Sequence, residues 1–316
     1  MNVAPESRAC RLQLGENTVL SMEQAVKDGA FAVEFDVQLT RDMAPVIYHD
    51  WNVSETGMDI PVNALTLSQF LSHGPRSKRL SRSRSCSSLG EATSSSSSSG
   101  AAASMANSAS TVQAPFATLR DLFESLPESV GFDIEIKYPM ADEADEAGVC
   151  TSFEMNLFVD QILDVVLSYT SPPHLASSAL PPSRRRPIVF TSFHPDICLL
   201  LAHKVSGRFP IMLLTDAGMS RMADCRCNSL NAAVKLCKWM GLSGIVSHVS
   251  PIAESPRVAF LVRRHELALG TYGKLNNQAR YVRLQKLYGV DVVIADDVPA
   301  ALAALSPAAG AARPVA

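Results

Sequence analysis

Several features that would point to membranes or nucleic acids are missing from this sequence. No apolar segment is long enough to span a bilayer, and the first residues, MNVAPESRACRLQLG, contain no hydrophobic stretch typical of a signal peptide. The net charge of −3 is too small to indicate binding to nucleic acid or to an anionic membrane surface. We therefore expect neither a transmembrane segment nor a nucleic-acid partner.

Cysteines with the spacing of a metal site are also missing. The chain has seven cysteines, and the only close pair, Cys225 and Cys227, has a single residue between its members and no histidine nearby. An odd number of scattered cysteines favours reduced thiols, as in a cytoplasmic protein. The glycine pattern GxGxxG follows none of the strands predicted below, which argues against a dinucleotide-binding sheet.

The most informative segment that is present runs from Phe31 to Asp50, FAVEFDVQLTRDMAPVIYHD. Polar and apolar residues alternate here with a period of two, which predicts a strand whose successive side chains point to opposite faces. Glu34 and Asp36 therefore share one face, and a second short strand, PVIYH, leads to His49. Two carboxylates beside a histidine suit a metal site with a general base. A half-buried strand with a solvated acidic face is the alternative.

Strands and helices alternate along most of the chain. A helix is predicted over Thr18–Lys27, and seven strands are predicted in total: EFDV, DIEI, VFTS, IMLL, GIVS, LALG and VVIA. This alternation predicts parallel pairing and a single α/β domain over residues 1–316, built as a TIM (β/α)₈ barrel, with a doubly wound sheet as the competing architecture. Because such a barrel has eight strands, one strand is missing, and its place would be before Thr18.

Residues 74–113 interrupt this alternation. The segment is rich in Arg and Ser and then consists almost entirely of Ser, Gly and Ala, so it cannot bury enough apolar surface to offset the entropy of ordering it. We expect a disordered insertion within the barrel domain, preceded by a short helix over Leu65–Leu71, and a frayed tail over residues 306–316. A tolerated surface loop is favoured over a phosphorylation target or an RNA-contacting tract.

Three carboxylates occupy strand positions that normally exclude charge: Glu34 and Asp36 on the first strand and Glu135 on the next. In a parallel barrel the functional groups gather at the carboxyl ends of the strands, so we expect these three to share a confined cleft. They cannot all be ionised there without a countercharge, and a divalent cation, Mg²⁺ or Ca²⁺, would supply it. Lys137 adds a positive group suited to a phosphate, and His49 would be the general acid or base.

The segment LGENTVLSMEQAVKDGAFAVEFDVQLTRDMAPVIYHD resembles the opening of the glycerophosphodiester phosphodiesterase domain, and the motifs FDIEIKYP, FTSFHPD, TYGKLNN and VIADD follow in that family's order. The spellings LQLGENT and FDIEIKYP look most like the eukaryotic cytosolic branch, whose enzymes act on glycerophosphocholine. The resemblance implies a TIM barrel and metal-dependent hydrolysis of a glycerophosphodiester to glycerol 3-phosphate and an alcohol.

The resemblance also implies roles for particular side chains: metal ligation by Glu34, Asp36 and Glu135, acid–base catalysis by His49, phosphate contact by Lys137 and a site carboxylate at Glu16. In the family's chemistry a free glycerol hydroxyl attacks the neighbouring phosphate, and water then opens the cyclic phosphate. One histidine takes a proton and a second histidine supplies one to the leaving alkoxide.

One motif of that family is missing: the His-Arg-Gly that it carries on its first strand. No histidine precedes His49, so the missing strand and the missing catalytic histidine are one deficit. Two interpretations stay open. In the first, the chain is a fragment or begins at an internal methionine, which leaves room for an N-terminal regulatory domain in the parent protein. In the second, the chain is a pseudoenzyme that binds metal or phosphodiester. We favour the first and expect this chain to be weakly active at best, because loss of one acid–base group typically costs about 10²- to 10⁴-fold in rate.

Two residues of the TYGKLNN motif, Tyr272 and Asn276, stand where the alcohol moiety would rest. The tyrosine ring can contact a choline through a cation–π interaction, and a packing role is the alternative. A lysophospholipase D, which would require a longer apolar groove, is a further alternative to the hydrolase activity.

Two histidines after the later strands, His194 and His248, could line the cleft or stand at the start of a helix, and we do not predict a catalytic role for either. We expect Asp296 and Asp297 to cap the final helix, and Arg184, Arg185 and Arg186 to lie on a solvated surface.

Overall fold

The computed structural model describes residues 13–54, 57, 59–75, 111–112, 114–149, 153–170, 186–205, 207–220, 222 and 224–306. Most of the predicted insertion over 74–113 lies outside these residues, as do the tail beyond Ser306 and the pair Arg184 and Arg185. Within the described part of the chain, no helix has both the length and the apolar character needed to cross a membrane.

Seven parallel strands form the centre of the molecule: β2 (Ala32–Leu39), β8 (Gly131–Ile136), β9 (Ile188–Ser192), β10 (Ile211–Thr215), β11 (Gly244–His248), β12 (Ala268–Tyr272) and β13 (Val292–Val293). They lie side by side in the order β13-β12-β11-β10-β9-β8-β2. Two short antiparallel strands, β3 (Pro45–Ile47) and β7 (Ala117–Thr118), extend the sheet beyond β2. The prediction of a largely parallel α/β sheet is therefore confirmed.

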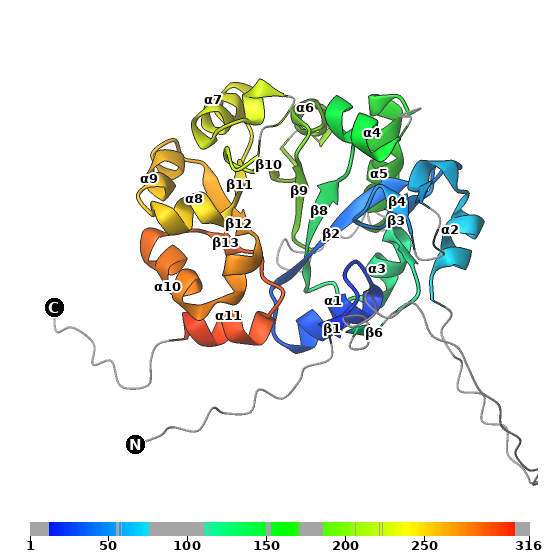
Figure 1. Cartoon of the computed structure of the whole chain (residues 1–316), viewed down its shortest axis with the longest axis horizontal. Coiled ribbons are helices and arrows are strands. Elements are labelled where there is room, and N and C mark those ends of the chain that lie inside the picture. Colours follow the sequence, from blue (N-terminus) through cyan, green and yellow to red (C-terminus); the bar gives the residue numbers. More distant parts are fainter. Residues whose placement is uncertain are drawn as a thin grey trace, which may run out of the picture.

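Helices connect the strands and surround them on the outside (Figure 1). They are α1 (Val19–Lys27), α2 (Leu67–His73), α3 (Leu119–Ser125), α4 (Ala141–Ala147), α5 (Met155–Thr170), α6 (Pro195–Val205), α7 (Leu230–Met240), α8 (Val249–Glu254), α9 (Val258–Arg263), α10 (Ala279–Tyr288) and α11 (Val298–Leu305). The predicted first helix begins one residue later than expected, because Thr18 is its N-cap and accepts a hydrogen bond from the Ser21 amide. Thr66 caps α2 in the same way, so this short helix begins and ends two residues later than we predicted.

The central sheet is not closed into a ring by hydrogen bonds. The short strand that precedes Thr18, β1 (Gln13–Leu14), pairs with β6 (Thr111–Val112) and not with the central sheet. Among the described residues, no eighth parallel strand lies between β13 and β2. The helical layer nevertheless comes together there, because Leu302 of α11 lies against Gly29 before β2, where a Cβ would be only 3.2 Å from the leucine.

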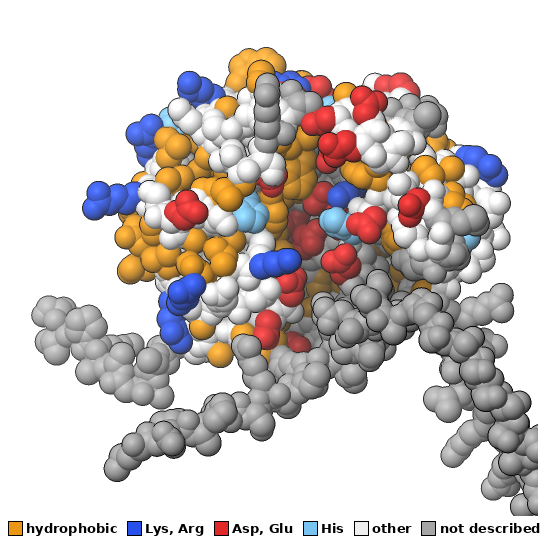
Figure 2. Space-filling view, viewed as in Figure 1, with side chains coloured by type: hydrophobic (Ala, Val, Ile, Leu, Met, Phe, Trp, Pro, Cys, Tyr) orange, Lys and Arg blue, Asp and Glu red, His pale blue; other side chains and the backbone are white. Residues whose placement is uncertain are grey.

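The two faces of the sheet differ in chemistry. The outer face packs against the helices through a large apolar core that contains Phe35, Ile134 and Leu213. The inner face of β2 and β8 carries carboxylates, whereas the inner face of the later strands is apolar and includes Leu214 and Val246. Figure 2 shows acidic and hydrophobic side chains gathered around a hollow on the face that this view presents.

Arg186 corrects one prediction. We expected a solvated arginine, but Arg186 is only 9% exposed and donates hydrogen bonds to the carbonyl oxygens of Val130 (2.9 Å) and Leu126 (2.8 Å). Its guanidinium lies 3.9 Å from the centroid of the Phe132 ring. Because guanidinium is planar and weakly hydrated, it can stack on an aromatic ring and satisfy carbonyl groups inside the protein. The residue therefore holds the start of β9 against the loop before β8.

Candidate active site

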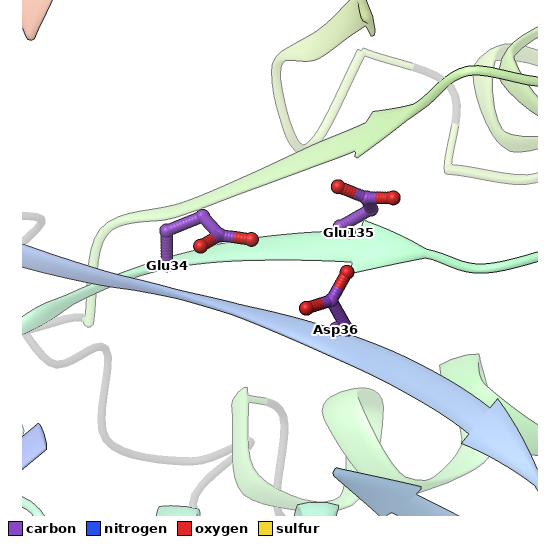
Figure 3. Close-up of side chains that lie close together, drawn as sticks. All are labelled: Glu34, Asp36 and Glu135. Carbon is purple, nitrogen blue, oxygen red and sulfur yellow. The ribbon is translucent and has the colours of Figure 1, made fainter. Parts of the chain in front are cut away.

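Three carboxylates from β2 and β8 converge on the inner face of the sheet (Figure 3). Asp36 is the direct partner of Glu135 in the parallel pairing of the two strands, and Glu34 lies two residues before Asp36 on the same face. One carboxylate oxygen from each of the three residues lies within 4.8 Å of those of the other two. Asp36 and Glu135 are 4% and 9% exposed. The strand alternation and the register together bring the three predicted residues to one place.

Burial makes ionisation of this cluster costly. Desolvation, with repulsion from Asp36 as the next cause, raises the pKa of Glu135 to about 8 and raises the pKa of Glu34 well above its ordinary value. A fourth carboxylate on the same face, Asp133, has a pKa raised by burial to about 7, although it accepts a hydrogen bond from Thr191. Carboxylates crowded in this way remain ionised together only when positive charge is near.

Lys137 supplies part of that charge. Its ammonium nitrogen lies 3.8 Å from Asp36 Oδ1 and 3.8 Å from Glu135 Oε1. Burial by itself would lower the pKa of Lys137, but the two carboxylates raise it above the ordinary value, so the lysine is charged. The ammonium also lies 5.0 Å from the centroid of the Trp51 ring, which limits the directions that the side chain can take. One lysine cannot neutralise three carboxylates, and a divalent cation fits this oxygen-only donor set.

Asn17 holds Asp36 in place, and we did not predict this role. Its side-chain nitrogen donates to Asp36 Oδ2 at 2.7 Å, and its side-chain oxygen accepts from the Asp36 amide at 3.0 Å. Asn17 adopts a left-handed backbone conformation with φ of 52°, which asparagine tolerates better than most residues. Its place in the sequence Glu16-Asn17-Thr18, directly before the helix cap Thr18, is the signal that could have identified it.

His49 lies in the loop after β3, beside the acidic cluster in sequence but more exposed. Its Nδ1 is 2.8 Å from Asp50 Oδ1, and its side chain is 53% exposed. Gln38, the next inward residue of β2 after Asp36, donates hydrogen bonds to the carbonyl oxygens of Tyr48 (2.8 Å) and Asp50 (2.7 Å). The strand that carries the carboxylates therefore also fixes the loop that carries the histidine.

A cleft of about 200 Å³ brings His49 and Glu16 together. It is lined by residues from the loop before α1, from the His49 loop and from the segment before β7: Gly15, Glu16, Asn17, Thr18, Tyr48, His49, Asp50, Pro75, Ala114 and Phe116. Glu16 is exposed, so it is free to reach a ligand in this cleft. Both residues of the predicted catalytic pair thus line one cleft together with Asn17, which contacts the acidic cluster.

Tyr272 ends β12 on the inner face of the sheet. Its hydroxyl donates a hydrogen bond to Asp216 Oδ1, and its ring contacts the rings of His248 and Phe193. Asn276 does not line this region as expected. It is fully buried and donates to the carbonyl oxygens of Thr271 (3.0 Å) and Ile294 (2.8 Å), so it joins β12 to the segment after β13.

Most of the remaining candidates lie at helix starts. Asp297 caps α11 by accepting from the Ala300 amide, and His248 caps α8 by accepting from the Ser250 amide. Pro195 begins α6, directly after His194. Asp296 differs, because it accepts a hydrogen bond from Asn277 at 2.7 Å instead of capping the helix.

Comparison with known proteins relates this arrangement to a family. The model of the "Glycerophosphoryl diester phosphodiesterase family" matches residues 5–300. The chain is 39% identical to the glycerophosphocholine phosphodiesterase GDE1 of Candida albicans over 322 residues, which cover 91% of this chain and 26% of that protein. It is 34% identical to the glycerophosphodiester phosphodiesterase GDPD3 of Arabidopsis thaliana, with 90% of this chain and 69% of that protein covered. The chain spans about a quarter of the length of the fungal relatives.

Solved structures share the fold. A phosphodiesterase of Oleispira antarctica, in complex with the product sn-glycerol-3-phosphate, matches with a TM-score of 0.60 at 16% identity, covering 94% of both chains. A glycerophosphoryl diester phosphodiesterase of Silicibacter pomeroyi matches with a TM-score of 0.65 at 18% identity, covering 94% of this chain and 91% of that one. These neighbours are TIM barrels, so the predicted barrel fold is confirmed, although hydrogen bonds do not close the described sheet.

Proposed function

Because this chain belongs to the glycerophosphoryl diester phosphodiesterase family, we propose that it hydrolyses glycerophosphodiesters, with glycerophosphocholine as the first substrate to test. The products would be glycerol 3-phosphate and the free alcohol. The observation that supports this proposal most directly is the convergence of Glu34, Asp36 and Glu135, with Lys137 3.8 Å from two of them. Names of the relatives support the same substrate class.

Glu34, Asp36 and Glu135 would hold a divalent cation, Mg²⁺ or Ca²⁺, and such an ion would supply Lewis-acid stabilisation of the charge that grows on the phosphate. Lys137 would bind a phosphate oxygen, and its position between Asp36 and Glu135 keeps it protonated. Asn17 keeps Asp36 oriented through its two hydrogen bonds.

His49 performs one of the two proton transfers of the reaction. The free glycerol hydroxyl next to the phosphate attacks phosphorus, a new P–O bond forms, and the bond to the alcohol oxygen breaks, which leaves a cyclic phosphate. Water then attacks phosphorus, the ring P–O bond to that hydroxyl oxygen breaks, and glycerol 3-phosphate is released. The hydroxyl loses a proton and the leaving alkoxide gains one, and His49 is the exposed imidazole beside the cleft that can exchange protons with either. Asp50 orients the ring through Nδ1, and Glu16 faces the same cleft, where it would bind the glycerol hydroxyls or the attacking water.

Product analysis tests the proposal. The chain is incubated with glycerophosphocholine and Mg²⁺ or Ca²⁺, and phosphorus NMR and a choline assay follow the products. We expect choline and glycerol 3-phosphate in equal amounts. Phosphocholine and glycerol would identify cleavage of the other ester bond, and saturable binding without turnover would identify a pseudoenzyme. Faster choline release from lysophosphatidylcholine would favour the lysophospholipase D alternative.

Gln38 provides a separate test of how the histidine loop is held. Changing Gln38 to methionine removes the hydrogen bonds to the Tyr48 and Asp50 carbonyls while keeping a side chain of similar length. We expect kcat to fall about 10- to 100-fold, because small displacements of a reacting group have effects of this size. Gln24→Met, which changes an exposed residue of α1, is the matched control. Equal kcat values for the two variants would show that the loop does not depend on Gln38.

The location of the protein stays a prediction from its cysteines. Cys198, Cys227 and Cys237 are buried free thiols, and Cys225 is an exposed one, in the part of the chain that the structure describes. Free thiols persist in reducing compartments, so we propose a cytoplasmic enzyme.

A further inference from the structure

A row of three polar side chains crosses the carboxyl ends of β10, β11 and β12 on the inner face. His248 is the direct partner of Tyr272 in the pairing of β11 with β12, and Asp216 follows Thr215, which is the partner of Ser247. Thr215 and Ser247 are fully buried and point to the helical side. Their neighbours Asp216 and His248 therefore point inward, across the mouth of the sheet from the acidic cluster. None of these three side chains has a role in the proposed proton transfers.

Aromatic rings meet edge to face around Tyr272. The Phe193 ring lies 5.9 Å from the Tyr272 ring at an interplanar angle of 89°, and the His248 ring lies 5.3 Å away at 76°. Rings in this arrangement form a corner in which the faces of two rings can contact one bound group. Tyr272 is only partly buried, and its hydroxyl is fixed by the hydrogen bond to Asp216. The hydrogen bond and the ring contacts therefore limit the movement of this corner.

Asp216 gives this corner a negative charge. Tyr272 occupies one of its carboxylate oxygens, and Asp216 forms no ion pair within the described residues. The surrounding inner face is apolar, with Leu214, Val246 and Ile294 packed nearby. A half-buried carboxylate beside aromatic rings and without a basic partner is suited to a cationic ligand.

The corner also lies within electrostatic reach of the reaction site. Burial is the largest cause that raises the pKa of Tyr272, and the interaction of Tyr272 with Asp216 is the next. The charge of Glu135 raises this pKa further, so Tyr272 is close enough to the acidic cluster to be affected by it. If the glycerol portion binds in the cleft of Glu16 and His49, as the proposed function has it, a phosphodiester held at Lys137 and the acidic cluster would direct its alcohol portion toward the later strands. The glycerol end of the substrate would contact Glu16 and His49, and the alcohol end would contact the aromatic corner.

Building on the proposed function, we propose that Asp216, Tyr272 and Phe193 form the site of the leaving alcohol and select alcohols that carry a quaternary ammonium group. A quaternary ammonium cannot donate N–H hydrogen bonds, so its binding is stabilised by contact with ring faces and by a nearby negative charge. The binding of a neutral polyol is stabilised neither by the ring faces nor by the charge. A primary ammonium gains from the carboxylate but loses more hydration when it is placed among apolar side chains.

Substrate competition tests this site. The full chain and its variants are compared on glycerophosphocholine, glycerophosphoethanolamine and glycerophosphoglycerol, with the ratio of kcat/KM values as the readout. We expect Asp216→Asn, which keeps the shape and the acceptor for Tyr272, to lower the preference for glycerophosphocholine over glycerophosphoglycerol about tenfold. Tyr272→Leu is expected to lower it about as much, and Tyr272→Phe, which keeps the ring, about threefold at most. Asp164→Asn, at an exposed site on α5, is the matched control.

Choline binding provides a readout that does not depend on turnover. Saturation-transfer NMR with choline at constant ionic strength should show binding to the unchanged chain and to Asp164→Asn, and about tenfold weaker binding to Asp216→Asn. An equal preference ratio in Asp216→Asn and the unchanged chain, or choline binding that survives Tyr272→Leu, would overturn the proposal even if hydrolysis is observed. Choline binding with the expected pattern in a chain that hydrolyses none of the substrates would support this site while contradicting the proposed function.

Discussion

Replacing Glu135 with glutamine is expected to lower kcat/KM for glycerophosphocholine about 10³-fold, which corresponds to about 4 kcal/mol of lost transition-state stabilisation. The reason is geometric, since Glu135 is the only one of the three converging carboxylates that comes from β8, and the other two come from β2. Glutamine keeps the shape of the side chain but removes the charge that a divalent cation requires. A chelator should cause a loss of similar size in the unchanged chain and little further loss in the variant.

The stability of the same variant separates a metal site from a structural acidic cluster. Without metal, burial and repulsion from Asp36 disfavour the ionised form of Glu135, so the neutral glutamine should leave the free energy of unfolding unchanged or raise it. With a cation at 100 times its dissociation constant, the unchanged chain should gain about 2.7 kcal/mol, and the variant much less. Denaturant unfolding with Mg²⁺, with Ca²⁺ and with chelator measures both effects.

Glu146→Gln is the matched control for this experiment, because Glu146 is exposed on α4 and lies on the chain just after the cluster. It should retain full activity and the full stabilisation by metal. Stabilisation of Glu135→Gln by metal to the same extent as the unchanged chain would remove Glu135 from the ligand set. Activity that withstands the chelator in the unchanged chain would contradict the metal-dependent mechanism itself.

The acidic cluster could be predicted only in part from the sequence. The alternation in β2 was enough to predict that Glu34 and Asp36 share a face, because side-chain direction in a strand depends only on position parity. The meeting with Glu135 depends on the register between two strands separated by almost a hundred residues, with the insertion between them. Periodicity contains no information on that register, so the expectation depended on the barrel and on the family resemblance.

Other features could not have been predicted from local patterns. Arg186 belongs to a basic run that is typical of solvated loops, and its burial depends on carbonyl groups of Leu126 and Val130 far earlier in the chain. Asn17 and Gln38 act through backbone groups of other segments, and such contacts leave no periodic signal. Asp216 and Tyr272, 56 positions apart, are joined only by the pairing of β10, β11 and β12. Tertiary contacts of this kind decide which polar residues serve the site and which, like Asn276, serve the fold.

Replacing His49 with glutamine should lower kcat for glycerophosphocholine about 10²- to 10⁴-fold, the range for loss of a general acid or base. In the described residues, His49 is the histidine that lines the cleft beside the acidic cluster, so no neighbouring imidazole is placed to substitute for it. The effect should fall mainly on kcat, because the exposed ring contributes little to binding of the phosphate, which depends on Lys137 and the metal ligands. His265→Gln, before β12 at the opposite end of the sheet, is the matched control.

A second substrate identifies which proton His49 transfers. In a glycerophosphodiester of 4-nitrophenol, the leaving group departs as a stable anion and needs no proton. If His49 protonates the leaving alkoxide, His49→Gln should hydrolyse this ester almost as fast as the unchanged chain does and glycerophosphocholine far more slowly. If His49 takes the proton of the attacking hydroxyl, both substrates should slow to the same degree. Unchanged rates on both would exclude His49 from acid–base catalysis and leave Glu16, on the same cleft, as the group to replace next.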